Sequence, residues 1–353
     1  MKPPAEVESG LYRQTPESGG GLIIAPTAPY LAAFVFYDRG PPVTDHAHTH
    51  STPPEGLADD LAAAFQIDGW PVRGRLVRLG ETIDAILSAH AYPEPVAALL
   101  GEACVLAAIL GSTLKFEGRL IVQAQGDGPV RYVVADYDTD GNLRGYCRFD
   151  PDAVAAVSQG FARPGARTLL GQGVFVMTLD RGPDFERTQG ITPIEGESLS
   201  LAAEHYFQQS EQIPTKVRLA VGSVETDTGS QWRAGGALIQ LIAGDDARGS
   251  TEEVWDRSRA LFQTLADDEL IDPTITPETL LFRLFHEDGV RLEDARALQA
   301  RCRCSKDRIS AVLASFAEAE RAEMIEDDGK IRVTCEYCAT VYELAPEEIV
   351  AAD

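Results

Sequence analysis

The chain has 353 residues, a length typical of two or three domains, and its 55 acidic and 31 basic residues give a formal net charge of −24. A surface this acidic repels phosphate backbones and anionic lipids, which argues against nucleic acid and membranes as partners. Hydrophobic residues make up 44% of the chain, so a packed core is expected. Six cysteines are too few for a secreted disulfide scaffold, and no convincing export signal is present, so we expect a cytoplasmic protein.

Residues 1–57 do not have the pattern of a folded domain. They contain nine prolines, a run of three glycines and three alternating histidines, His46, His48 and His50. We interpret this segment as a disordered extension or as the product of a start codon placed too early, with Val43 as a candidate first residue. The histidines could bind a metal weakly, but a solvated polar tail is the simpler interpretation.

Residues 58–244 have the pattern of a single α+β domain. Strands are predicted at 72–76, 119–125, 130–136, 143–149, 173–180 and 216–221, and helices at 81–90, 96–110 and 198–211. Because no helix-length pattern recurs between the strands, we expect a mostly antiparallel sheet with packed helices. The apolar segment 96–110, at about 15 residues, is too short to span a bilayer and is predicted to be a buried core helix.

Two cysteines lie inside these predicted elements. Cys104 falls in the apolar helix, and Cys147 lies on the same strand face as Leu143, Gly145 and Phe149. A lone cysteine in an apolar setting is most simply a small core residue. We therefore expect both thiols to be buried and to have no redox role.

Residues 245–300 combine acidic pairs with apolar residues at helical spacing. Thr276 followed by Pro277 is a helix-start signal. The apolar residues that define the predicted helices are Val254, Trp255, Leu261, Phe262, Leu265, Leu280, Leu281, Leu284 and Phe285. Such helices need an apolar surface while their acidic faces repel one another, so we interpret the segment as a metastable helical linker. The alternative is an amphipathic helical hairpin with no switching role.

The remaining four cysteines lie at the end of the chain, as Cys302-x-Cys304 and Cys335-x-x-Cys338. Two pairs of thiolates on two tight turns are what tetrahedral Zn²⁺ requires, so we predict one zinc ion on these four residues. A helix capped by Ser305 and a small hairpin would bring the two pairs together. We expect this helix to carry Ile309, Val312, Phe316 and Glu320 on one stripe, and the hairpin to consist of 331–335 and 341–344, after a turn at Asp328-Gly329.

The predicted zinc-binding domain, 301–346, is followed by a tail, 347–353, and is close to the size at which a hydrophobic core alone no longer suffices. Its first cysteine pair has four basic neighbours, Arg301, Arg303, Lys306 and Arg308. Positive charge favours the thiolate and so its reactivity with oxidants. The alternative is a purely structural zinc site with solvated basic residues around it.

The cysteine pairs resemble those of the heat shock protein thirty-three family of redox-regulated holdase chaperones. Segments of the preceding domain resemble the same family: Tyr92–Val96 (YPEPV), Leu114–Gly118 (LKFEG), Gln125–Pro129 (QGDGP), Gln189–Ile191 (QGI) and Tyr206–Thr215 (YFQQSEQIPT). The resemblance covers roughly residues 60–346. It implies an α+β core, a metastable helical linker and a zinc-binding redox switch.

The resemblance also implies a mechanism. The reduced, zinc-loaded protein is inactive or weakly active, and peroxide with mild heat, or hypochlorite, converts the cysteines to the disulfides Cys302–Cys304 and Cys335–Cys338 with release of zinc. Switch domain and linker then unfold, the protein dimerises, and newly exposed apolar surface holds unfolded or oxidatively damaged client proteins without ATP. Candidate client-binding residues in the linker are Trp255, Phe262, Leu281 and Phe285.

Two other classes of function compete with a non-enzymatic chaperone. A zinc-ribbon accessory protein for transcription or nucleic-acid binding would share the cysteine pairs, but the net charge of −24 argues against it. A thiol-disulfide oxidoreductase would use Cys335-x-x-Cys338, but that motif normally opens a helix, whereas here it lies between two predicted strands.

Overall fold

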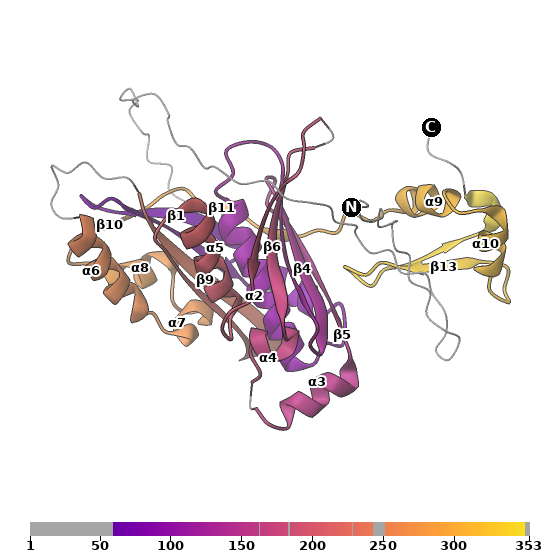
Figure 1. Ribbon diagram of the computed structural model, residues 1–353, viewed down its shortest axis with the longest axis horizontal. Coiled ribbons are helices and arrows are strands. Elements are labelled where there is room, and N and C mark those ends of the chain that lie inside the picture. Colours follow the sequence, from indigo (N-terminus) through magenta and orange to yellow (C-terminus); the bar gives the residue numbers. More distant parts are fainter. Residues whose placement is uncertain (1–58, 162, 183, 228, 243–250, 350–353) are drawn as a thin grey trace, which may run out of the picture. The chain divides into compact units, whose positions relative to one another are not determined.

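The computed structural model describes residues 59–349 except 162, 183, 228 and 243–250, so the interpretation of residues 1–57 lies outside the described part. The described residues fall into two compact units, 59–301 and 302–349, and each is treated by itself. Both combine helices with antiparallel strand pairs, which confirms the predicted α+β class (Figure 1).

The first sheet of the larger unit has the strand order β10-β1-β2-β9-β8, with β11 also paired to β1. Its strands are β1 Leu61–Ile67, β2 Val72–Leu79, β8 Thr215–Thr226, β9 Gly229–Leu241, β10 Val290–Leu292 and β11 Arg296–Ala297. The predicted strands at 72–76 and 216–221 are present and longer than expected. β1, with the sequence LAAAFQI, was not predicted. Five of its seven residues are apolar and buried, and they lie on both faces of the strand, so the sequence lacks the alternation of apolar and polar residues that indicates a strand.

The second sheet has the order β12-β5-β4-β3-β6-β7. Its strands are β3 Arg119–Gly126, β4 Val130–Asp138, β5 Asn142–Phe149, β6 Gly173–Asp180, β7 Thr188–Pro193 and β12 Gln299–Ala300. The four strands predicted in this region are confirmed as β3 to β6, and their pairings with one another are antiparallel. The pairing of β12 with β5 is parallel.

Helix α2, Glu94–Gly111, contacts strands of both sheets and is the centre of the larger core. It has 18 residues, longer than the predicted segment, so its length and hydropathy would suffice to cross a membrane. In the structure, however, 83% of the helix is buried inside the protein, as expected for a core helix. Cys104 on α2 and Cys147 on β5 are both buried, as predicted.

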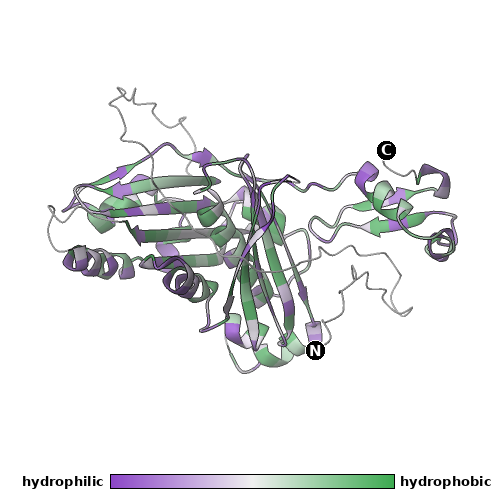
Figure 2. Ribbon diagram, turned by 45° about the horizontal axis from the view of Figure 1, so that its top comes forward, coloured by the Kyte–Doolittle hydropathy of each residue, from purple (hydrophilic) through white to green (hydrophobic). Residues whose placement is uncertain are grey.

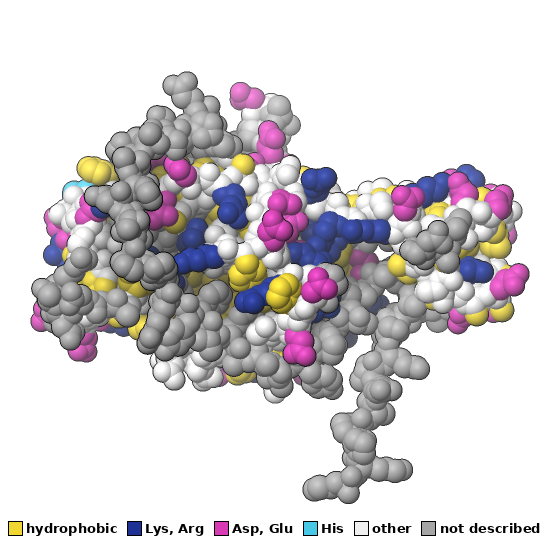
Figure 3. All heavy atoms as spheres, turned by 90° about the horizontal axis from the view of Figure 1, so that it is seen from above, with side chains coloured by type: hydrophobic (Ala, Val, Ile, Leu, Met, Phe, Trp, Pro, Cys, Tyr) yellow, Lys and Arg dark blue, Asp and Glu magenta, His cyan; other side chains and the backbone are white. Residues whose placement is uncertain are grey.

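Four further helices complete the core: α1 Glu81–Leu87, α3 Pro151–Ser158, α4 Ala166–Leu170 and α5 Leu199–Tyr206. The predicted helix at 198–211 is regular only to Tyr206, and its last part, Phe207–Glu211, is a π-helical turn. The face drawn in Figure 3 carries both acidic and basic side chains, so the net charge does not give a uniformly acidic surface.

The segment predicted as a helical linker contains α6 Thr251–Gln263, α7 Asp267–Ile271 and α8 Pro277–Phe285. Thr276 caps α8 by accepting a hydrogen bond from the backbone N–H of Thr279, as the Thr-Pro signal predicted. The apolar sides of these helices pack on the first sheet, while their outer sides are hydrophilic (Figure 2). Phe262, Leu281 and Phe285 are buried in this contact and Trp255 is half-buried. After α8 the chain forms β10, β11 and β12 instead of continuing as helix.

The smaller unit contains α9 Lys306–Ala314, α10 Glu318–Glu323, β13 Ile331–Thr334, β14 Val341–Leu344 and a 3₁₀ turn, Pro346–Glu348. Its buried core has five residues: Ile309, Leu313, Ile331, Val333 and Leu344. The expected single helical stripe is wrong beyond α9, because the helix ends before Phe316 and Leu313, not Val312, is the buried residue. Glu320 instead accepts a hydrogen bond from the backbone N–H of Ala317 and so stabilises the start of α10.

Candidate metal centre

The two cysteine pairs lie on two loops of the smaller unit. Cys302 and Cys304 precede α9, which Ser305 caps by accepting a hydrogen bond from the N–H of Arg308. Cys335 and Cys338 lie on the turn between β13 and β14. That turn is closed by two backbone hydrogen bonds, from Ala339 to the Cys335 carbonyl at 2.9 Å and from Cys335 to the Thr340 carbonyl at 2.9 Å. Helix capping and strand pairing therefore fix both loops.

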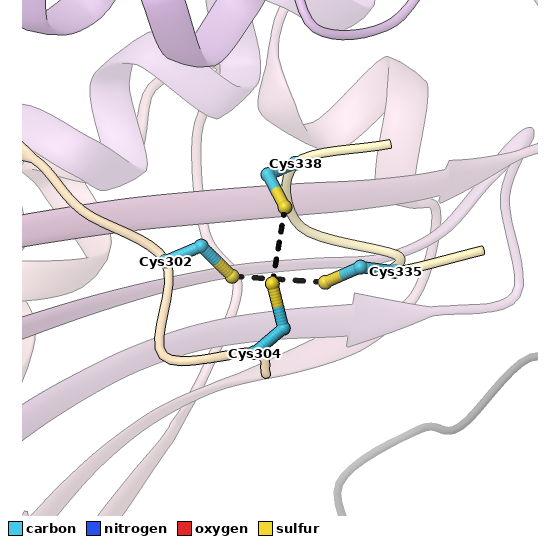
Figure 4. A group of neighbouring side chains, drawn as sticks. All are labelled: Cys302, Cys304, Cys335 and Cys338. Atoms are coloured by element: carbon cyan, nitrogen blue, oxygen red, sulfur yellow. Dashed lines mark hydrogen bonds between the residues drawn. The ribbon is translucent and has the colours of Figure 1, made fainter. Parts of the chain in front are cut away.

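The four sulfur atoms converge, as the sequence predicted (Figure 4). All lie within 4.8 Å of one another, with 3.6 Å between Cys302 and Cys335 and 3.4 Å between Cys304 and Cys338. In a tetrahedral site with Zn–S bonds of about 2.3 Å, neighbouring sulfurs are about 3.8 Å apart. A disulfide bond would need about 2.05 Å. The residues therefore fit a four-thiolate zinc site made of free cysteines.

Each of these two short contacts joins a cysteine of the first pair to a cysteine of the second. The loop before α9 and the hairpin turn thus meet through their sulfur atoms. A metal held there would crosslink positions more than thirty residues apart in sequence.

Proton sharing makes Cys302 and Cys335 chemically unequal. The hydrogen bond between them lowers the pKa of Cys302 and raises the pKa of Cys335. Burial raises the pKa of Cys304, partly opposed by a hydrogen bond from Tyr342. Because a bound zinc ion requires thiolates, metal binding at this site releases protons.

The basic residues around the first pair have partners of their own. Lys306 forms an ion pair with Glu348 at 2.7 Å, and the Arg308 guanidinium donates to the backbone carbonyl of Arg303 at 2.8 Å. The largest pKa effects at Cys302 and Cys304 come from neighbouring thiols, burial and Tyr342. Lys306 and Arg308 thus bond to groups other than the cysteine sulfurs, and activation of the first cysteine pair by basic side chains stays a prediction.

Two residues that support the site were not predicted from the sequence. The Tyr342 hydroxyl donates to the Cys304 sulfur at 3.1 Å, and the Thr340 hydroxyl lies 3.2 Å from the Cys338 sulfur. Both follow the second cysteine pair closely, and Tyr342 shares the inner face of β14 with buried Leu344. Tyr342 could have been identified from the sequence, because it is a polar residue on the inner face of the strand that follows a Cys-x-x-Cys turn.

Replacing Tyr342 with phenylalanine is expected to weaken metal binding without unfolding the domain. The substitution removes the O–H···S hydrogen bond and keeps the ring. Loss of such an outer hydrogen bond typically costs roughly 10–100-fold in metal affinity. Competition with a chromophoric chelator would measure it, with Val341→Ala, an exposed position on the same strand, as control. Equal affinity in both variants would contradict the role of Tyr342.

Comparison with known proteins assigns the fold and the cysteine centre to one family. The family model described as Hsp33 protein matches residues 60–345. The chain belongs to the Hsp33 family. This membership places it among the chaperones, as the sequence motifs predicted.

Relatives of known name agree with the family model. The 33 kDa chaperonin of Caulobacter vibrioides is 67% identical over 298 residues, which cover 84% of this chain and 99% of the relative. The 33 kDa chaperonin of Cronobacter sakazakii is 35% identical over 283 residues, covering 80% and 91%. The crystal structure of the Hsp33 homologue from Thermotoga maritima matches with a TM-score of 0.67 at 23% identity, covering 82% and 96%, and supports the fold.

Proposed function

We propose that this chain is a redox-regulated, ATP-independent holdase whose switch is one Zn²⁺ bound by Cys302, Cys304, Cys335 and Cys338. The observation that carries the proposal is the convergence of the four sulfurs within 4.8 Å. All four side chains are only half-buried, so a small oxidant can reach them. A half-exposed cluster of metal-binding thiolates is suited to sensing oxidants, whereas the buried Cys104 and Cys147 are not.

Zinc would supply the crosslink between the two cysteine loops and keep the thiols deprotonated. The protein part of the smaller unit supplies little stability of its own, because its buried core has five residues. A unit of fewer than about 50 residues usually needs such a metal or disulfides to stay folded. Loss of the metal should therefore unfold the unit.

Oxidation accounts for the loss of metal by electron balance. Two thiolates give up two electrons to one molecule of hydrogen peroxide and form one disulfide, and with two protons the peroxide becomes two waters. Two such steps convert the four ligands into Cys302–Cys304 and Cys335–Cys338. Disulfide sulfurs carry no negative charge and do not hold zinc, and neither disulfide joins the two loops.

The proposed clients are unfolded or oxidatively damaged proteins, and the proposed binding surface lies beneath and on the linker helices. Phe262, Leu281 and Phe285 are buried against the first sheet, with Trp255 half-buried beside them, so the folded protein hides these residues. Release of the linker would expose them together with the sheet residues they cover. We further propose that the activated protein is a homodimer and acts in the cytoplasm.

The test is to treat the reduced full-length protein with hydrogen peroxide and to follow zinc release, disulfide pairing and aggregation suppression in parallel. We expect both neighbouring disulfides, loss of hydrogen-exchange protection across 302–349 and the linker, and suppression of client aggregation after oxidation only. In the reduced structure the sulfurs of Cys302 and Cys335, and those of Cys304 and Cys338, are in contact across the two loops. If these became the dominant disulfides and 302–349 stayed protected, the switch mechanism would be wrong.

A further inference from the structure

Residues 290–301, which we call the strap, run along the outer edges of both sheets of the larger unit. β10 and β11 pair with β1 antiparallel, and β12 pairs with β5 parallel. In the strand orders of the two sheets, β1 and β5 would be edge strands if the strap were removed. One short segment thus closes two sheet edges in succession.

The strap is held mainly through its backbone. Four N–H groups of the strap donate to carbonyls of the edges: Glu293 to Ala64 at 2.8 Å, Leu298 to Asp60 at 2.7 Å, Gln299 to Gly141 at 3.0 Å and Arg301 to Leu143 at 3.0 Å. Most of its side chains face solvent, and Leu298 is the one strap side chain buried in the core. Some strap side chains add bonds at particular positions: Arg291 to Asp68 at 2.6 Å, Arg296 to the Tyr137 hydroxyl at 3.2 Å and Gln299 to Asn142 at 2.9 Å. The backbone pairing runs along the whole strap beside them.

The covered edge of β1 lacks the usual protection against pairing with other chains. Natural edge strands carry charges, prolines or bulges that block further pairing. β1 has none of these in its seven residues, LAAAFQI, and its pairing with β2 is regular from Leu61 to Gln66. An uncharged, regular, apolar edge of this kind adds strands readily, and the strap is what covers it.

We propose that the edges of β1 and β5 are binding sites for extended segments of unfolded polypeptide, which join the sheets as an added strand once the strap leaves. This inference rests on the proposed function and deepens it by naming the recognised feature, the free backbone of an extended chain. Main-chain pairing supplies affinity with little dependence on sequence, which suits a protein that must hold many clients. The strap demonstrates the fit, since it is itself an extended segment paired antiparallel on one edge and parallel on the other.

The position of the strap connects it to the switch. Its last hydrogen bond comes from the N–H of Arg301, the residue directly before Cys302. The strap and the metal-bound unit are thus joined without an intervening residue, so we infer that unfolding of the unit affects the adjoining end of the strap. When that unit unfolds, the strap competes less well with an incoming segment.

Peptides with the strap sequence, residues 289–301, give a direct test on the oxidised full-length protein. One peptide is N-methylated at Glu293, Gln299 and Arg301, whose N–H groups face the edges. A matched peptide is N-methylated at Leu292, Ala297 and Ala300, whose N–H groups point away by strand alternation. We expect the unmodified peptide and the matched peptide to displace a client that is kept unfolded by reduction and alkylation. The peptide methylated at Glu293, Gln299 and Arg301 should compete at least roughly tenfold more weakly, because it lacks three hydrogen-bond donors.

Hydrogen exchange on the same complex provides a second measurement. Client binding should protect the amides along the covered edges of β1 and β5, and also that of Asp68, directly after β1, which in the reduced protein donates to Gly289, directly before the strap, at 3.0 Å. If the oxidised protein holds no client at all, the proposed function fails. If it holds client, but the two methylated peptides compete equally and these amides gain no protection, the holdase function stands and the sheet-edge proposal is overturned.

Discussion

Removal of the metal from the reduced protein is expected to unfold residues 302–349 and to loosen the linker, while the core of residues 59–242 stays folded. Structural zinc contributes an apparent binding free energy of about 10–16 kcal/mol, whereas whole domains are stable by about 5–15 kcal/mol. The five buried residues of the smaller unit cannot replace that contribution. The core around α2 consists of residues of the larger unit alone and should not depend on the site.

Hydrogen exchange with and without a strong chelator would measure this loss, and Cys335→Ser should reproduce it without chelator because it removes one thiolate. Cys147→Ser is the matched control, since it removes a thiol whose pKa is raised by burial in the larger core. It should leave metal content unchanged even if it destabilises that core. Full metal occupancy together with a protected 302–349 in Cys335→Ser would exclude the four-thiolate site.

Replacing Arg78 with methionine is expected to loosen the linker in the absence of any oxidant. Arg78 on β2 is fully buried and donates to the carbonyls of Ile275 at 2.7 Å and Asp272 at 2.5 Å, in the loop between α7 and α8. Burial lowers the pKa of this guanidinium, and Asp59, 3.5 Å away, opposes that effect. Removing one partner from a buried, charged network of this kind costs about 3–5 kcal/mol.

Hydrogen exchange across 251–285 and client binding by the reduced protein would measure the effect of Arg78→Met. Arg78→Lys keeps the charge but not the forked donors, so we expect an intermediate result. Arg73→Met, at an exposed position of the same strand, should behave like the parent protein. If Arg78→Met kept the linker fully protected, apolar packing alone would hold α7 and α8 on the sheet.

The sequence predicted features that depend on local pattern. The Cys-x-Cys and Cys-x-x-Cys pairs, the Thr276–Pro277 helix start and the alternating strands β3 to β6 have signals within a few residues. β1 had no such signal, because it is apolar almost throughout and so lacks the alternation of a half-buried strand. The family resemblance, and no local pattern, implied that oxidation of the two cysteine pairs unfolds the linker.

Other features depend on contacts between distant parts of the chain. The strands of the strap have two or three residues each and pair with strands more than 150 residues earlier. No local pattern can indicate such short strands, since their partners define them. The same holds for Arg78, whose acceptors lie nearly 200 residues later, and for Tyr342, whose partner Cys304 belongs to the other cysteine loop.

The central position of α2 has a consequence for synthesis of the chain. α2 is buried along its length by strands of both sheets, and the last of these, β9, ends about 130 residues after α2 does. At about 5–20 residues per second, a ribosome needs roughly 6–26 seconds to make that stretch. For that time the most apolar helix of this chaperone lacks part of its covering, so the nascent chain presents the kind of surface that chaperones bind.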